Sequence, residues 1–334
     1  MAEKKLFRVA LREALDEEMA RDKRVYVIGE DIGLFGGAYR ITEGLLDKYG
    51  PLRVVDPPIA EEVIVGSAVG AAMTGLRPVV EMMTVNFSLV AFDQIVQNAA
   101  KIPYMFGGEV SVPLVIRMPG GAGHQLSAQH SHSFEALYAS IPGLIVVAPT
   151  TAADAKGMLK SSIRSDNPII FHESMSLYNT RGEVPDEEYL TPLGKAAVRR
   201  KGSDLTIVGV SRQAIQAEQA AAKLEEEDVD AEVIDLRSLR PLDWPTLIES
   251  VKRTNRCLVV EEGWSTYGVG AEVAAGLQER CFDYLDAPIR RIGGAEVPMP
   301  YNQFLEKAAI PSIENIVEGA LRVVGKKGAE LTHA

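Results

Sequence analysis

Short apolar runs alternate with amphipathic segments along the second half of the chain. Strands are expected at 205–210, 231–236, 257–261 and 289–292, and the first three of these runs are mostly apolar, which is typical of strands buried on both faces of a parallel sheet. The segments at 212–224, 244–251, 268–280 and 313–324 have the periodicity of amphipathic helices. This alternation of strand and helix predicts a parallel sheet covered by helices on both faces.

The first half repeats this rhythm with longer loops. A first helix should carry an apolar stripe at positions 7, 11, 14, 15 and 19. Strands are expected at 25–28, 77–82, 112–117, 143–148 and 168–173, and helices at 89–100 and 152–164. Pro57 and Pro58 cannot lie inside a helix, so a further helix should begin near Ala60.

The polar stretch at 179–194 is rich in Pro and Gly and is typical of an interdomain linker. A chain of 334 residues is also long for one core. We therefore predict an α/β protein of two three-layer α/β/α domains, at 1–185 and 186–334.

Composition narrows the function classes. The formal net charge of −11 disfavours nucleic acid and anionic membrane surfaces as partners, because both would repel the chain. No apolar run approaches the roughly 20 residues needed to cross a bilayer. The first segment carries acids and no uninterrupted apolar core, which is typical of a helix rather than a signal peptide. Two cysteines far apart in sequence indicate neither a metal pair nor a disulfide framework. These features predict a soluble, cytoplasmic protein.

The segment PPIAEEVIVG contains the first candidate for chemistry, Glu61. Acids in a first helical turn are ordinary, because they interact favourably with the helix dipole. Here, however, the two prolines and the small apolar residues of the helix would bury the site. A buried carboxylate has a raised pKa suited to proton transfer. Glu62 points about a quarter-turn away and is expected on the surface.

Two further segments follow expected strands. Phe87, in EMMTVNFSLVAFDQ, is either a core residue or a stacking face for a ligand at the carboxyl end of a strand. His124, His130 and His132 lie in one glycine-rich loop, but their spacing completes no metal-ligand set. Catalysis or anion binding suits this loop better, because imidazole titrates near neutrality, although an exposed loop without a role is also compatible.

One familiar motif is incomplete. GVGAEV, at 268–273, follows a strand and has two glycines at the spacing of a dinucleotide-binding loop, but it lacks the third. It favours a nicotinamide-dependent reductase only weakly. Walker, HExxH and GxSxG motifs do not occur in the sequence.

Taken together, these segments resemble a known family. The segments DPPIAE, EMMTVNFSLVAFDQIVQNAAK, SAQHSHSFEA, PGLIVVAP, DAKGMLKSSIRSDNP, EVIDLRSLRP, EEGWSTYGVGAE and DAPIRRIGGAEVPMPY resemble, in order and over essentially the whole chain, the β subunit of the decarboxylating component of 2-oxo acid dehydrogenases. That family joins a transketolase-like pyrimidine-binding domain to a transketolase-type C-terminal domain.

The resemblance implies roles for individual residues. Glu61 would hydrogen-bond the pyrimidine nitrogen N1′ of thiamine diphosphate and switch the cofactor on by exchanging a proton there. Phe87 would stack on the aminopyrimidine, with Ile59 and Met83 lining the pocket. His130, in AQHS, would face the substrate and take part in passing the acyl group to lipoyl. His124 stands where related chains often carry arginine, and no role follows for it or for His132.

The segment KSSIRSDNP also resembles the family's potassium site. Unpaired carbonyls at the end of a helix suit a cation. The ligands implied are the backbone carbonyl oxygens of Leu114, Ser162, Ile163, Ser165 and Asn167.

A missing motif implies a partner. The chain has no GDG with a downstream Asn, the motif that carries Mg²⁺ and diphosphate in thiamine enzymes. The resemblance therefore implies an α subunit that supplies them within an α2β2 heterotetramer, and a lipoyl-bearing acyltransferase that accepts the acyl group. The 2-oxo acid fits pyruvate best. Acetoin or branched-chain enzymes share this plan, and a non-catalytic scaffold subunit is the alternative from another class.

Overall fold

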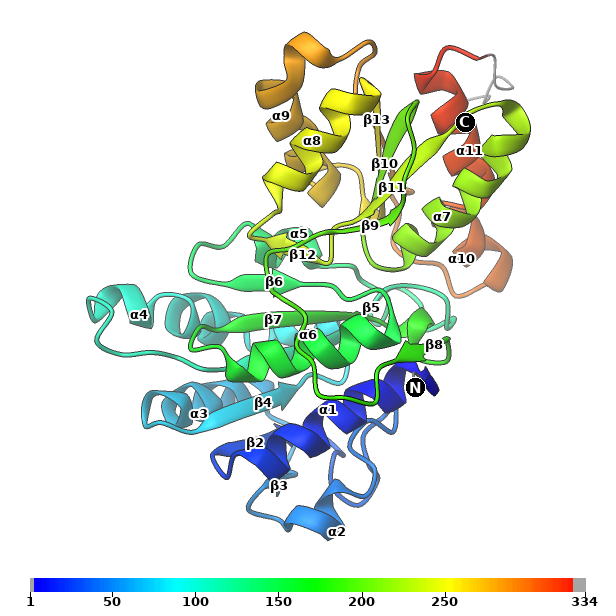
Figure 1. Ribbon diagram of the computed structural model, residues 1–334. Coiled ribbons are helices and arrows are strands. Elements are labelled where there is room, and N and C mark those ends of the chain that lie inside the picture. The colour runs from blue at the N-terminus through cyan, green and yellow to red at the C-terminus, as the bar shows by residue number, and fades with distance from the viewer. Residues whose placement is uncertain (1–2, 327–334) are drawn as a thin grey trace. The chain divides into compact units, whose positions relative to one another are not determined.

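The computed structural model describes residues 3–326, so the outermost ends of the two predicted domains, at 1–2 and 327–334, lie outside the described residues (Figure 1). The chain divides into two compact units. Within the described part, the first comprises 3–124, 129–193 and 239–241, and the second comprises 125–128, 194–238 and 242–326. The main division, after residue 193, falls inside the segment predicted as the linker.

The first unit is built on a seven-stranded sheet. Its strand order is β12-β6-β7-β5-β4-β2-β3, and the pairs β6–β7, β7–β5, β5–β4, β4–β2 and β2–β3 are all parallel. Parallel pairing places the carboxyl ends of these strands along one edge. The strands are β2 (Val25–Gly29), β3 (Val54–Val55), β4 (Arg77–Glu81), β5 (Val115–Gly120), β6 (Ile145–Val147), β7 (Ile169–Ser174) and β12 (Ser238–Arg240).

Helices of the first unit bury the predicted apolar stripes. The stripe of α1 (Phe7–Arg21) is buried as expected, and its polar side contacts α6 (Ala152–Arg164) through Lys156–Glu13 and Lys160–Glu17 ion pairs. Figure 1 shows these two helices side by side. The other helices are α2 (Leu45–Tyr49), α3 (Glu61–Met73), α4 (Ile102–Met105), α5 (Glu135–Ala139), η1 (Val85–Leu89), η2 (Gln94–Ala99) and η3 (Met175–Leu177).

The expected linker is partly a strand. β8 (Arg181–Val184) pairs antiparallel with β1 (Glu3–Leu6), with Glu3 opposite Val184. The polar pattern of 179–194, predicted as the interdomain linker, gave no indication of a strand at these four residues. The partner strand of β8 lies far away in the sequence, and a local polar pattern does not report such pairing.

Two other elements differ from expectation. Residues 89–100 are helical only in part, because a 3₁₀ turn at η1 precedes a π-helix at η2, which contains the wide-turn bond from Ala100 N to Ile95 O. The third strand, expected at 112–117, begins at Val115 instead. Pro113 has no N–H for a ladder, which delays the strand.

The second unit has a five-stranded sheet in the order β14-β13-β10-β11-β9. All pairs are parallel except β11–β9. The strands are β9 (Ala197–Arg200), β10 (Leu205–Gly209), β11 (Ala231–Asp235), β13 (Cys257–Trp264) and β14 (Arg290–Gly294). The helices are α7 (Arg212–Leu224), η4 (Glu225–Glu227), α8 (Trp244–Thr254), α9 (Val269–Cys281), η5 (Phe282–Tyr284), α10 (Gln303–Ala309) and α11 (Ile313–Val323).

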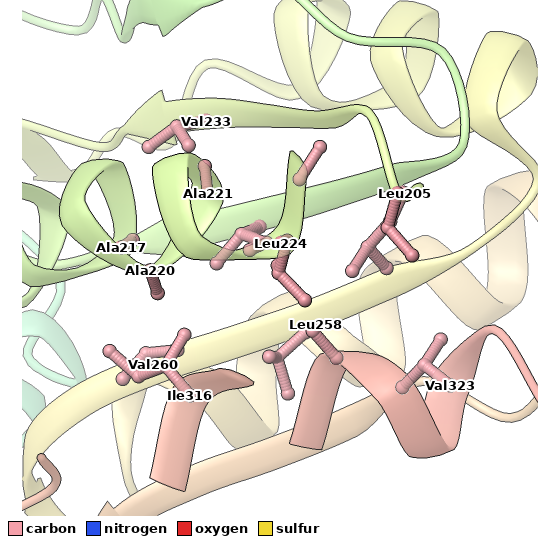
Figure 2. Packing of buried hydrophobic residues seen from close by; sticks show 14 residues of the cluster. Leu205, Ala217, Ala220, Ala221, Leu224, Val233, Leu258, Val260, Ile316 and Val323 are labelled. Carbon is pink, nitrogen blue, oxygen red and sulfur yellow. The ribbon is translucent and has the colours of Figure 1, made fainter. Parts of the chain in front are cut away.

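Alternate side chains of β10 face different helices. Leu205 and Ile207 join an apolar cluster with α7 and α11, which Figure 2 shows from close by. Thr206 lies between them in sequence, and its hydroxyl is 2.6 Å from Ser250 Oγ on α8. Helices therefore cover both faces of the sheet, and the predicted three-layer α/β arrangement is confirmed.

Candidate active site

The sequence candidates converge on one edge of the first sheet. Glu61 follows β3, Phe87 follows β4 and His130 follows β5, and the unexpected Glu30 follows β2. These four strands are consecutive in the sheet order β5-β4-β2-β3 and run parallel. Their carboxyl ends meet at the edge where α/β sheets bind ligands.

Glu61 is the first residue of α3 and is buried, with 9% of its surface exposed. Ala60, which precedes it, offers no side-chain cap to the helix. Glu62 is exposed, as expected. The structure therefore keeps one of two adjacent carboxylates away from solvent and leaves the other in water.

Glu30 was not among the candidates that the sequence pattern singled out. It is 8% exposed, and its Oε1 has no hydrogen-bond partner among the described residues. Burial, followed by the charge of nearby Glu61, raises the pKa of the Glu30 carboxyl. An acid placed directly after an apolar strand was the available signal. Its proximity to Glu61 depends on the pairing of β2 with β3.

A carboxylate fixes the turn that follows Glu30. Asp56 Oδ1 accepts from Asp31 N at 2.9 Å, and Asp56 Oδ2 accepts from Gly33 N at 3.0 Å. A Cβ at Gly33 would lie only 2.8 Å from Asp56 Oδ2. The loop after β2 is thereby tied to the segment that leads from β3 to Glu61.

The loops after β4 and β5 contact each other through aromatic rings. The half-buried rings of Phe87 and His130 meet edge to face, with centroids 5.4 Å apart. Met83, on the same loop as Phe87, is half-buried. Ile59, just before α3, is 77% exposed in the isolated chain.

Below this edge lies a buried ionic cluster that sequence reasoning also missed. Arg117 on β5 donates to both oxygens of Glu173 on β7, at 2.7 and 2.9 Å, and to Glu81 on β4. Tyr178 donates its hydroxyl proton to Glu173 at 2.7 Å. Burial raises the pKa of the Glu81 carboxyl against the effect of Arg117. The cluster joins the neighbouring strands β4, β5 and β7.

The three loop histidines differ in environment. His124 is exposed, whereas His132 is half-buried and contacts the Asn86 side chain through Nδ1. Burial lowers the pKa of His132. Within residues 3–326 the structure contains no cluster of three His, Cys, Asp or Glu side chains suited to a metal ion.

Four of the carbonyls implied as potassium ligands, those of Leu114, Ser162, Ile163 and Ser165, accept hydrogen bonds within the chain. Arg77 Nη1 donates to Ile163 O at 3.0 Å and to Ser165 O at 2.9 Å. Leu114 O and Ser162 O each accept one backbone bond. A carbonyl oxygen has two lone pairs, so each of these oxygens keeps one acceptor site.

The incomplete glycine motif at α9 is filled by the chain itself. Gly270 N, in the first turn of α9, donates to Glu261 Oε1 at 2.9 Å. A Cβ at Gly268 would lie 2.5 Å from the same carboxylate oxygen. The glycines thus admit the chain's own carboxylate where a dinucleotide phosphate would bind a helix N-terminus. This geometry argues against the nicotinamide reading.

Comparison with known proteins defines the class first. Residues 3–181 match the family described as "Transketolase, pyrimidine binding domain", and residues 194–316 match "Transketolase, C-terminal domain". The solved structure "Split gene transketolase, inactive beta4 tetramer" covers 98% of this chain and 99% of its own, with a TM-score of 0.80 at 23% identity. The fold is therefore that of transketolase-like proteins.

Relatives in sequence are more specific. "Pyruvate dehydrogenase E1 component subunit beta, mitochondrial" of Dictyostelium discoideum is 51% identical over 95% of this chain and 90% of its own. The corresponding subunit of Rickettsia felis is 49% identical over 95% of this chain and 97% of its own, and that of Rhizobium meliloti is 50% identical over 96% and 70%. The chain belongs to the family of pyruvate dehydrogenase E1 beta subunits, which confirms the resemblance read from its motifs.

Proposed function

We propose that the chain is the β subunit of a thiamine-diphosphate-dependent pyruvate dehydrogenase. With an α subunit it decarboxylates pyruvate oxidatively and passes the acyl group to the lipoyl group of an acyltransferase. The observation that carries this proposal is the burial of Glu61 at the carboxyl edge of the sheet, beside Glu30. A buried acid at that edge is suited to proton exchange with a ligand.

The residues present fit the pyrimidine end of the cofactor. Glu61 would hold and move a proton at N1′, and Phe87 would offer its ring for stacking. Ile59 and Met83 would line the same pocket, and the exposure of Ile59 suits a surface completed by a partner chain. When bound, the cofactor supplies the electron sink for decarboxylation. His130, held against Phe87, would face the substrate and assist acyl transfer to lipoyl.

The diphosphate end of the cofactor requires a second chain. We assign Mg²⁺ and the diphosphate contacts to the α subunit of an α2β2 heterotetramer, because the chain has no GDG motif. The lipoyl-bearing acyltransferase is the second protein partner. Cys257 and Cys281 are buried free thiols, which supports a cytoplasmic site of action. In residues 3–326, helices are too short or too polar to cross a membrane.

The function is tested by reconstitution. The purified β chain alone should show no turnover, because it provides half of the site. Mixed with its α subunit, thiamine diphosphate and Mg²⁺, it should reduce an electron acceptor with pyruvate faster than with acetoin or branched-chain 2-oxo acids. Turnover by the single chain would refute the shared site, and a preference for another substrate would reassign the oxo acid.

We also propose that K⁺ binds the carbonyls of Leu114, Ser162, Ile163, Ser165 and Asn167, beside Arg77. A ligand that binds only the folded state raises stability, by about 2.7 kcal/mol at 100 times its dissociation constant. Replacing choline chloride by saturating KCl at equal ionic strength should therefore raise the thermal unfolding midpoint. NaCl should raise it less. Equal midpoints in all three salts would show that the Arg77 guanidinium serves these carbonyls without a metal ion.

A further inference from the structure

A short segment leads from the glycine-rich loop of the three histidines back to the first sheet, and several contacts fix its position. We call residues 130–134 the return segment. Gly121 N, just after β5, donates to His132 O at 2.8 Å. The His132 ring stacks on Phe134, with centroids 4.5 Å apart, and its Nδ1 contacts Asn86. His130 therefore sits at the start of a segment whose far end is fixed to the sheet.

A buried pair of titratable side chains lies where the return segment ends. Glu135 is the first residue of α5 and is 8% exposed, and His172 on β7 is 1% exposed. Glu135 Oε1 is 3.3 Å from His172 Nδ1. Neither ring nitrogen of His172 has a hydrogen-bond partner among the described residues, and the Glu135 carboxyl group lies within ion-pair distance of the ring. The mechanism proposed above uses neither residue.

The surroundings of His172 leave it little freedom. A Cβ at Gly120, the last residue of β5, would lie 2.7 Å from His172 Nε2 and 2.8 Å from His132 O. The absence of a side chain at Gly120 thus lets the imidazole and the return segment pack against the same point of β5. A shift of His172 would be transmitted to the backbone that follows His130.

The pKa shifts of Glu135 and His172 are compatible with a close contact between the two side chains. Burial lowers the pKa of His172 to about 4, and burial raises the pKa of Glu135 to about 7. The charge of Glu173, which is itself paired with Arg117, acts in the opposite direction and raises the pKa of His172. At neutral pH the imidazole is therefore uncharged. The uncharged imidazole can lie against the carboxyl group of Glu135 without forming a buried ion pair.

We propose that Glu135 and His172 are positioning residues for His130. Their contact joins α5 to β7 and holds the return segment, so that the His130 ring stays against Phe87 at the site edge. The proposal deepens the proposed function, because it rests on His130 serving acyl transfer. The positioning itself can be measured without that assumption.

The direct test measures the chemical reactivity of His130 in the assembled heterotetramer. His172→Leu keeps an apolar core at β7 and removes the contact with Glu135. It should increase the rate of His130 modification by diethyl pyrocarbonate roughly tenfold, because the ring loses its cover. The exposed His124 is the internal control and should react at an unchanged rate. Glu135→Gln keeps the size and polarity of the side chain that contacts His172 and should behave as the unsubstituted protein does.

Activity gives the second readout. In the same His172→Leu enzyme, the rate of acylation of a lipoyl domain should fall by roughly 10- to 100-fold, which is the loss expected when a catalytic group is misplaced. Decarboxylation with an artificial electron acceptor should remain. An unchanged His130 modification rate in both His172→Leu and Glu135→Ala would overturn the positioning proposal. Unchanged acylation in His130→Asn would instead refute the role of His130 and leave the positioning result intact.

Discussion

Glu61→Gln should lower turnover of the reconstituted enzyme by about 10²- to 10⁴-fold, the range expected when a general acid–base group is removed. Glutamine keeps the shape of the side chain and its hydrogen-bonding oxygen but cannot exchange a proton. The substitution removes a buried charge next to Glu30. Folding and assembly should therefore be preserved. The measurement is the steady-state rate with pyruvate, together with the oligomeric state by sedimentation.

Glu62→Gln is the matched control. It removes the same charge one residue further along α3, from an exposed side chain. Its turnover should stay within about twofold of the original, as expected for a surface substitution. If Glu61→Gln is as active as Glu62→Gln, the chain is a scaffold for its partner rather than half of an active site.

Arg117→Met should cause the largest loss of stability. Arg117 is fully buried and is the cation that Glu81 and Glu173 share. Removing one partner of a buried ionic group typically costs about 3–5 kcal/mol, because the remaining charges stay buried without compensation. We expect a loss of this size in the free energy of unfolding, measured by urea denaturation of the assembled enzyme.

Two further variants locate the origin of that loss. Glu81→Gln should be milder than Arg117→Met, because burial already raises the pKa of Glu81 and Glu173 keeps both bonds from Arg117. Arg24→Met removes an exposed arginine paired with Asp22 and should leave stability unchanged. If Arg117→Met unfolds at the same urea concentration as Arg24→Met, the cluster contributes nothing to stability.

Helices with a regular apolar stripe could be predicted from the sequence. The helices expected at 152–164 and 212–224 have these bounds in the structure, as α6 and α7. The start of α6 is also marked locally, because the Thr151 side chain accepts from Asp154 N. In such segments, periodicity and caps act within a few residues, which is the range that a sequence pattern reports.

Elements whose structure depends on distant segments were harder to predict from the sequence. β8 exists because β1 pairs with it, across more than half of the first unit's length. The π-helix η2 packs closely on α3, since a Cβ on Gly66 of α3 would lie 3.2 Å from Gln94 Oε1. Local propensity cannot report such contacts, because the residues that make them are far apart in the chain.

By itself the sequence determined that this is a two-part α/β protein, and it singled out Glu61, Phe87 and His130 as residues that follow strands. The tertiary structure alone decided that Glu30 lies beside Glu61, that Arg117 joins three strands and that His172 lies against Glu135. The physical reason is sheet order. Parallel crossovers bring to one edge strand ends that are separated by tens of residues, and only the order β7-β5-β4-β2-β3 decides which side chains meet.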